Sequence, residues 1–228
     1  MFTHFEQTGL HFALLFAFLC IVIFLRYLLT AAFYHYFVLR FFQKRHSNRV
    51  LQTKALPARQ VRFEILRSAL SSIIFAAFAL ALFWLYLNDY TALYHQWSDH
   101  PLWYAPLSIL LFLLLQDTYY YWLHRWMHHP KLFRRLHKWH HESVQTSSLT
   151  SFSFNPSESI LQSLFFPAFL LLVPIHIYSF FLILLLMTLS ATINHGAVEI
   201  YPKTENFRWF RYWIIGATHH DQHQKKYN

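Results

Sequence analysis

The chain has a single cysteine, Cys20, and only three glycines among its 228 residues. One cysteine excludes an intrachain disulfide and a metal site built from thiolates. Glycine-rich phosphate-binding loops are absent, and so is the Gly-x-Ser-x-Gly turn that carries the nucleophile of many hydrolases. Internal repeats, low-complexity tracts and Gly/Ser linkers are missing as well. We therefore expect one integral unit whose chemistry depends on other side chains.

Charged residues are nearly missing from four long stretches of the chain. Hydrophobic residues make up 56% of the sequence and aromatic ones 21%, which is too apolar for an ordinary soluble domain. Residues 68–87 hold no charge at all, and a helix of that length crosses a hydrocarbon core of roughly 30 Å. The other stretches are 10–39, interrupted only by Arg26, 102–123, and 159–193. The sequence predicts an all-α, polytopic membrane helical bundle.

The stretch 159–193 is too long for one span and slightly short for two. Pro167 and Pro174 interrupt it, and a proline inside a helix kinks or ends that helix. We expect a tight helical hairpin that turns at residues 173–176, which gives about four spans in total. One long kinked helix is the alternative, and it would put the last histidines on the opposite side. The N-terminus lacks the pattern of a cleaved signal peptide, so the first stretch is expected to be a retained span.

Basic residues gather in the segments that would share one side of the membrane. The net charge is +9, residues 40–67 hold eight of the nineteen Lys and Arg residues, and residues 88–101 hold none. With the hairpin in place, eighteen of the nineteen lie on one side. Lys and Arg concentrate on the cytoplasmic side, so a bacterial inner membrane or the ER membrane would fit. Because these charges flank apolar spans, membrane orientation explains them and we expect no nucleic-acid partner.

Ten of the seventeen histidines lie at or after His124 on the proposed cytoplasmic side, leaving out His176, and most of them are in spaced groups. Spacings of three and four residues put side chains on one face of a helix, where neutral imidazoles can converge on a metal ion. The apolar stretch 102–123 leads directly into the first group and gives it a rigid base. The ten predicted ligands are His124, His128, His129, His137, His140, His141, His195, His219, His220 and His223.

The remaining histidines are isolated and are interpreted as interfacial or helix-capping residues. His176, at the tip of the expected hairpin, should meet the lipid headgroups of the opposite side. The others are His4, His11, His35, His46, His95 and His100.

The number of grouped histidines favours two metal ions. A structural zinc takes four protein ligands and a catalytic zinc three, so ten imidazoles exceed one zinc site and suit two metals with about four or five nitrogens each. Zinc does not change oxidation state, whereas iron with open positions can activate O₂. The pattern therefore favours a pair of iron ions.

The order and surroundings of these groups resemble the fatty acid hydroxylase/sterol desaturase superfamily of membrane non-haem di-iron oxygenases. The stretch from Asp117 to Arg125 is similar to the entry into the first histidine box, and the stretch from His137 to His141 to the second. Residues 154–158, Phe-Asn-Pro-Ser-Glu, resemble a Phe-His-Pro-x-Glu segment, and Asn-His-Gly at 194–196 resembles the isolated histidine before the last box. The resemblance begins near residue 102, so residues 1–101 are expected to form membrane spans with a basic cytoplasmic loop, and residues 102–228 a fatty acid hydroxylase-like domain.

The resemblance implies two irons held by histidines in a cytoplasmic, His-rich helical cap. It implies an O₂-dependent hydroxylation or desaturation of a fatty acyl chain or sterol, with electrons from cytochrome b5, ferredoxin or a similar donor. His129 and His219 are additional ligand candidates. The ligands carried over by position are His124, His128, His137, His140, His141, His195, His220 and His223.

The chain departs from the pattern at three places. Gln224 follows His223 where the last box usually ends in a second histidine, and an amide oxygen is a harder, weaker ligand than imidazole. Asn155 replaces a usual histidine and is expected beside the ligands or at a helix cap. The sequence stops at Asn228, where relatives run on, so a fragment or a catalytically impaired relative is an alternative.

Three carboxylates beside the boxes, Asp117, Glu142 and Asp221, have two open interpretations. They orient ligand imidazoles through the second ring nitrogen, or they serve as helix caps or as salt-bridge partners of Arg125 or Arg135.

Two other protein classes are alternatives to the oxygenase. A membrane cytochrome needs facing histidine pairs within the spans, and His11, His35 and His176 form no such pair in the sequence. A zinc transporter needs ionisable ligands near the bilayer midplane, where the predicted spans have almost none. Both classes fit the sequence less well.

Overall fold

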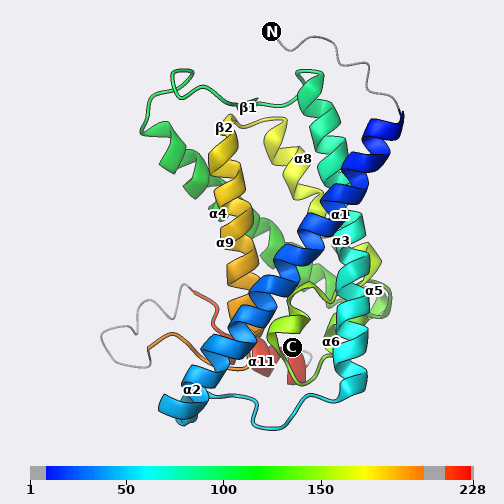
Figure 1. Ribbon diagram of the computed structural model, residues 1–228, viewed down its shortest axis with the longest axis vertical. Helices are drawn as coiled ribbons and strands as arrows, with labels where there is room; N and C mark the ends of the chain where they lie inside the picture. Colours follow the sequence, from blue (N-terminus) through cyan, green and yellow to red (C-terminus); the bar gives the residue numbers. More distant parts are fainter. Residues whose placement is uncertain (1–8, 203–213, 227–228) are drawn as a thin grey trace.

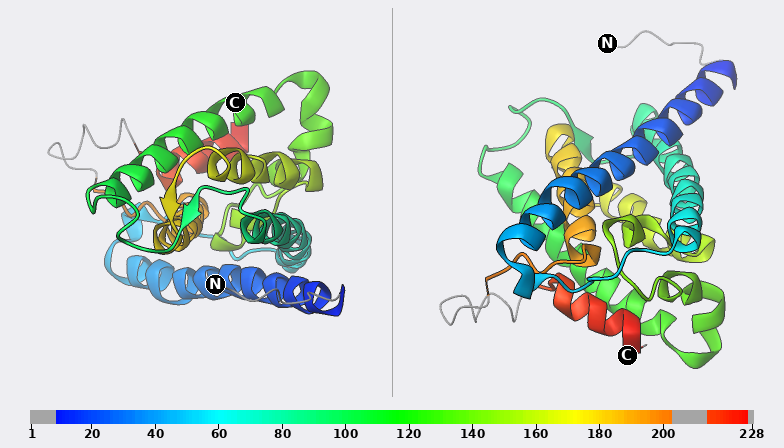
Figure 2. Two further views of the ribbon diagram at one scale, coloured as in Figure 1. Left: turned by 90° about the horizontal axis from the view of Figure 1, so that it is seen from above. Right: turned by 60° about the horizontal axis from the view of Figure 1, so that its bottom comes forward.

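The computed structural model describes residues 9–202 and 214–226, and most of them are helical (Figure 1). Long helices make up the body: α1 (Gly9–Phe33), α3 (Ala58–Leu87), α4 (Tyr104–Met127) and α9 (Ile177–His195). A π-helical turn, η1 (Tyr34–Leu39), extends α1 into α2 (Arg40–Arg45). Seen from above, α1 lies along one side and α4 along the other, with α3 and α9 between them (Figure 2). His4 and three basic residues of the tail, Lys203, Arg208 and Arg211, lie outside the described residues.

Three helices are long and apolar enough to cross a membrane: Gly9–Arg45, Ala58–Leu87 and Ile177–His195. The predicted polytopic all-α class is therefore confirmed. The predicted third stretch is indeed helical, as α4, but the second half of that helix carries Gln116, Asp117, His124 and Arg125, and α4 is not among the three. The expected total of about four spans stays a prediction.

The stretch 159–193 forms the predicted hairpin, and the alternative of one long helix is wrong. Its first arm is divided into α7 (Pro156–Ser163) and α8 (Phe165–Leu170), and α9 starts the return. Asn155 caps α7 by accepting a hydrogen bond from the N–H of Ser157 at 3.2 Å, and Pro156 occupies the first helical position, where no N–H is needed. The capping role predicted for Asn155 is confirmed.

A two-residue parallel pair joins the hairpin tip to the loop before α4. In this pair β1 (Leu93–Tyr94) runs beside β2 (Ile175–His176). His176 is fully buried here, so the prediction that it meets lipid headgroups is wrong. Its Nδ1 accepts a hydrogen bond from the N–H of Tyr178 at 3.2 Å, and its ring stacks on Trp97 with centroids 3.6 Å apart. The side chain caps α9 and fills an aromatic cluster.

The interior contains two apolar clusters. The larger joins α3, α4, α8 and α9 through Leu82, Phe112, Phe169 and Ile183. The smaller packs Tyr27 and Ala31 of α1 against Phe152. Many large apolar side chains point outward instead, such as Leu29, which is 67% exposed. Such an apolar exterior is expected where the solvent is lipid.

Short helices and loops form a cap at one end of the bundle, the lower end in Figure 1. They are η2 (Ser47–Arg49), α5 (Pro130–Leu136), α6 (Lys138–His141), η3 (Ser148–Phe152) and α11 (Ala217–Lys226). The right-hand view in Figure 2 brings this end forward and shows α11 beneath the end of α9. The described basic segments 40–67, 125–138 and 225–226 start or lie at this end, which agrees with the charge pattern of the sequence.

Polar contacts with the long helices hold η3 in place. Tyr27 of α1 donates its hydroxyl hydrogen to the carbonyl of Leu149 at 2.8 Å. Glu64 of α3 is fully buried and accepts hydrogen bonds from Thr150 Oγ1 and Gln60 Nε2, both at 2.9 Å. These bonds satisfy a carboxylate that would otherwise be costly to bury, and they fix the loop that runs beside the second histidine box.

Candidate metal centre

Histidines from four separate segments meet inside the cap. The end of α4, the α5–α6 turn, the last residue of α9 and α11 each contribute at least one imidazole. The side chains form two neighbouring groups with different members. We call them the first group (His124, His128, His137 and His223) and the second group (His140, His195 and His220).

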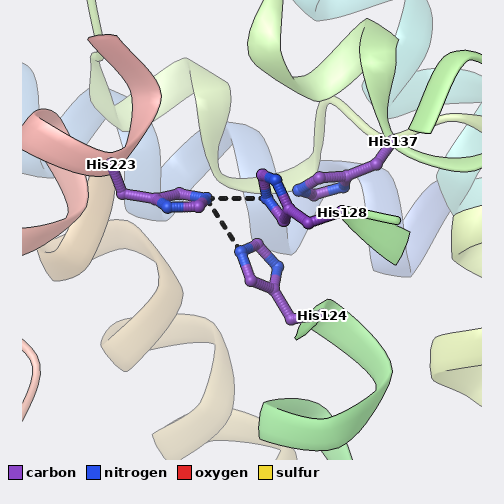
Figure 3. A group of neighbouring side chains, drawn as sticks. All are labelled: His124, His128, His137 and His223. Atoms are coloured by element: carbon purple, nitrogen blue, oxygen red, sulfur yellow. Dashed lines mark hydrogen bonds between the residues drawn. The ribbon is translucent and has the colours of Figure 1, made fainter. Parts of the chain in front are cut away.

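In the first group the ring nitrogens point toward one another (Figure 3). Nε2 of His223 lies 2.8 Å from Nε2 of His124 and 3.0 Å from Nε2 of His128. The rings come from opposite sides, since His124 and His128 lie one turn apart at the end of α4 and His223 reaches across from α11. Two donors at about 2.1 Å from one metal lie roughly 3.0–3.4 Å apart, and the two separations are at or slightly below this range, so a small outward shift of the rings would let them share an ion.

In the second group the backbone orients the rings. Nε2 of His195 lies 3.2 Å from Nε2 of His140, and the rings of His195 and His220 have centroids 4.0 Å apart. Nδ1 of His195 donates to the carbonyl of Ala191 at 2.7 Å, and Nδ1 of His140 to that of Ser153 at 3.3 Å. Since the proton is then on Nδ1, the lone pair of each Nε2 faces the other ligands of the group.

The two groups are adjacent, and His141 lies next to the first. Nε2 of His141 is 3.2 Å from Nε2 of His128, and the rings of His137 and His140 stack with centroids 5.2 Å apart. Because His137 and His140 are one helical turn apart yet belong to different groups, the second box bridges the two sites. The arrangement could hold two metal ions side by side.

Burial favours the neutral form of His140, His141 and His220. Desolvation, followed by the neighbouring imidazoles, lowers the pKa of His141 to about 3. The same causes, in the same order, lower the pKa values of His140 and His220 well below their usual range. Neutral imidazole is the form that ligates metals, so the site is ready to bind at neutral pH without losing protons.

A buried carboxylate supports the first group from behind. Oε2 of Glu158, in the first turn of α7, lies 2.9 Å from Nδ1 of His137, and both side chains are almost fully enclosed. The two atoms are in electrostatic contact without being aligned for a hydrogen bond. Burial raises the pKa of Glu158, and the nearby His137 opposes that shift. A carboxylate on the far nitrogen of an imidazole is a common support for metal ligands.

The carboxylates that the sequence proposed for this role have other contacts. Glu142 pairs with Arg67, and Asp221 pairs with Lys225 at 2.7 Å. Asp117 is exposed on α4. Glu142 and Asp221 are therefore salt-bridge partners as the second interpretation has it, but the expected partners Arg125 and Arg135 are wrong, and Asp221 is buried. The sequence does not predict the contact between Glu158 and His137, although Glu158 is the last residue of the segment 154–158 that resembles the family.

Three of the ten predicted ligands belong to neither group: His141, which lies beside the first group, and two exposed histidines. His129 is exposed and caps α5, accepting from the N–H of Lys131 at 3.4 Å. His219 is exposed on α11 and belongs to neither group. Both exposed histidines are next to a histidine that does join a group, and consecutive residues on a helix point in different directions.

Gln224 is completely buried at the second group. It follows His220 by one helical turn, and its Nε2 lies 3.4 Å from Nε2 of His220. The residue that departs from the histidine pattern is therefore part of the site's wall.

One comparison with known proteins finds a family to which the chain is similar. The family model described as fatty acid hydroxylase matches residues 109–228. All members of both groups, together with Glu158 and Gln224, lie in the matched region. No curated protein and no solved structure matches the chain.

Proposed function

The chain belongs to the fatty acid hydroxylase family, and on that premise we propose that it is a membrane-bound, O₂-dependent di-iron oxygenase that hydroxylates or desaturates a lipid. The family itself implies an oxidoreductase of the hydroxylase type that uses iron and acts on a lipid. The observation that carries the finer proposal is the meeting of seven histidines in two adjacent groups. One group alone would fit a single-metal site.

The histidines divide naturally between two ions. The first group would hold one iron, with His141 beside it, and the second group the other. When bound, the irons supply the O₂ reduction and the oxidising power that attack an unactivated C–H bond. His129 and His219 are not needed in this assignment.

The protein's own side chains orient the ligands and exclude water. The carbonyls of Ala191 and Ser153 hold the Nδ1 protons of His195 and His140, and Glu158 faces Nδ1 of His137. His137, His140 and His141 are at most 2% exposed, so bulk water has little access to this side of the centre. A dry site protects a reactive oxidant from side reactions.

An apolar groove beside α9 would admit the lipid. It has a volume of about 660 Å³ and lies between the α1–η1 junction and α9, with walls that include Leu29, Phe33, Phe37, Leu189 and Ile193. Ile193 is two residues from His195, so the groove ends close to the second group. Its walls are hydrocarbon and it lies along two candidate spans, which suits an acyl chain or sterol that arrives laterally from the bilayer.

The basic charge of the cap suggests how the protein is oriented in the membrane and which kind of electron donor it binds. Most of the Lys and Arg residues that the structure describes belong to segments at the cap end, which favours a cytoplasmic metal centre. An acidic electron-transfer protein such as cytochrome b5 or ferredoxin would be attracted to this end. In this proposal residues 102–228 form the catalytic unit, and residues 1–101 provide spans that cover it.

The test is the fate of labelled oxygen. Protein reconstituted in lipid, loaded anaerobically with Fe(II) and supplied with a reductant, is exposed to ¹⁸O₂, and the extracted lipids are analysed by mass spectrometry. A hydroxylase leaves ¹⁸O in the product, whereas a desaturase removes two hydrogens without retaining the label. His140→Ala should abolish either product, and His46→Ala, at an isolated exposed histidine, should not. Iron-loaded protein that converts no acyl lipid or sterol would refute the proposal.

A catalytically impaired relative is the second candidate, favoured by the buried amide of Gln224 where the pattern has a histidine. In that case the parent protein forms no product, and Gln224→His restores turnover in the same assay.

A further inference from the structure

The side chain of Gln224 has one polar atom without a partner. Gln224 is 0% exposed, and its Oε1 forms no hydrogen bond with the part of the chain that the structure describes. Burying an amide oxygen without a partner destabilises a protein. A buried glutamine that served only to fill space could be replaced by an apolar residue without that cost, so its amide suggests a polar ligand.

The position of Gln224 points to the second group. On α11, His220 and Gln224 are four residues apart and therefore lie on one face, while the exposed Gln222 lies on the other. The terminal amide nitrogen is 3.4 Å from Nε2 of His220. A half-turn of the amide group exchanges its nitrogen and oxygen, and it puts Oε1 in that place. A separation of roughly 3.0–3.4 Å is what two donors on one ion would have.

The two groups also differ in their number of imidazoles. The first has four and is flanked by His141, whereas the second has three. A donor atom from Gln224 would therefore give the second group a fourth protein ligand.

We propose that Oε1 of Gln224 is the fourth protein donor to the metal held by His140, His195 and His220. This inference rests on the proposed function, because it presumes that both groups hold metal. The two metal sites then differ in their donor atoms. The first has only nitrogen donors, and the second has three nitrogens and one amide oxygen. Since a neutral carbonyl oxygen is a weaker donor to late first-row metals than imidazole, the second site binds its ion more weakly and fills last.

The experiment is a titration of the metal-free protein, residues 1–228, with Co²⁺, because the visible spectrum of this ion reports its ligands. The parent is compared with Gln224→Leu, which removes the donor, and Gln224→His, which supplies a nitrogen. Gln222→Leu is the matched control, since it makes the same change on the exposed face of the same helix. A chelator competition gives the dissociation constant of each of the two sites.

We expect two unequal sites in the parent. Gln224→Leu should weaken only the weaker site, by at least about tenfold, because even indirect supports of metal ligands are worth 10–100-fold. Gln224→His should strengthen that site and change its spectrum. Gln222→Leu should match the parent.

Thermal unfolding of the metal-free proteins separates a ligand from a structural residue. With its oxygen unpaired, Gln224 adds little to the metal-free fold, so Gln224→Leu should unfold at or above the parent's temperature. Two sites of unchanged affinity in Gln224→Leu would overturn the role of Gln224 and leave the di-metal proposal standing. A parent that binds no Co²⁺ would overturn both.

Discussion

Oε2 of Glu158 lies 2.9 Å from Nδ1 of His137, and both side chains are withdrawn from solvent at the back of the first histidine group. Metal binding at the other nitrogen of His137 would make the Nδ1 proton more acidic and strengthen its attraction to the carboxylate. The contact therefore links a residue of α7 to the metal affinity of the α5–α6 turn.

The first prediction is that Glu158→Gln weakens metal binding at the first group by about 10–100-fold. The amide keeps the size of the side chain and removes its charge. The measurement is chelator competition with Co²⁺ on the metal-free protein. Glu142→Gln is the control, because Glu142 pairs with Arg67 near the surface of the cap and contacts no member of either group. Equal losses in both variants would mean that general electrostatics of the cap, not the contact with His137, sets the affinity.

The second prediction concerns the close packing between Gly196 and Tyr34. A Cβ at Gly196 would lie 2.2 Å from Cε1 of Tyr34, so an alanine must displace the ring that borders the groove. We expect Gly196→Ala to destabilise the protein by about 1–3 kcal/mol, the usual cost of overpacking. A lower thermal midpoint in detergent would report it.

Gly9→Ala is the matched control for that substitution, since nothing lies within 4 Å of a Cβ there. Removing the obstructing ring with Tyr34→Ala in the Gly196→Ala background should recover part of the loss relative to Tyr34→Ala alone. If the two substitutions are simply additive, the contact does not limit packing at Gly196.

The third prediction is a loss of stability of the metal-free protein in mild acid. The pKa of His141 falls to about 3 in the folded state from an ordinary value of 6.5. Between these two values the unfolded chain binds a proton that the folded protein resists, so stability decreases as pH falls. The stability contributed by neutral His141 should be fully present above about pH 6.5 and should decline from there toward pH 3.

The check is the thermal midpoint of the metal-free protein measured from neutral to acid pH, compared with His141→Asn, which removes the titrating group. The variant should show a shallower decline. A parent whose midpoint does not change as the pH is lowered would contradict the burial of neutral imidazoles.

The hairpin and the set of histidines could be predicted because each has a local cause. Pro174 in a long apolar run forces a turn, and spacings of three and four residues identify a helical face. The division of the histidines between two groups could not be predicted in the same way. His137 and His140 are three residues apart, as are His220 and His223, and in both pairs the two residues belong to different groups. Spacing shows that two side chains share a face but not which ion each approaches.

The supporting contacts were the least predictable part. Asp117, Glu142 and Asp221 are close to the boxes in sequence, yet Glu158, twenty-one positions after His137, is the carboxylate that reaches it. His176 was assigned to the membrane surface because a hairpin tip is usually exposed, and the loop around Trp97 instead folds over it. Both outcomes depend on packing between segments distant in sequence, which local patterns do not encode.

The most direct test of the account is the iron content of the purified protein, expressed in iron-replete cells and measured by mass spectrometry against protein concentration. The account predicts about two irons per chain, a clear loss in His140→Ala, and no loss in His219→Ala, whose ring lies outside both groups. One iron or none in the parent, or equal iron in His140→Ala and the parent, would contradict a di-iron centre built from these two groups.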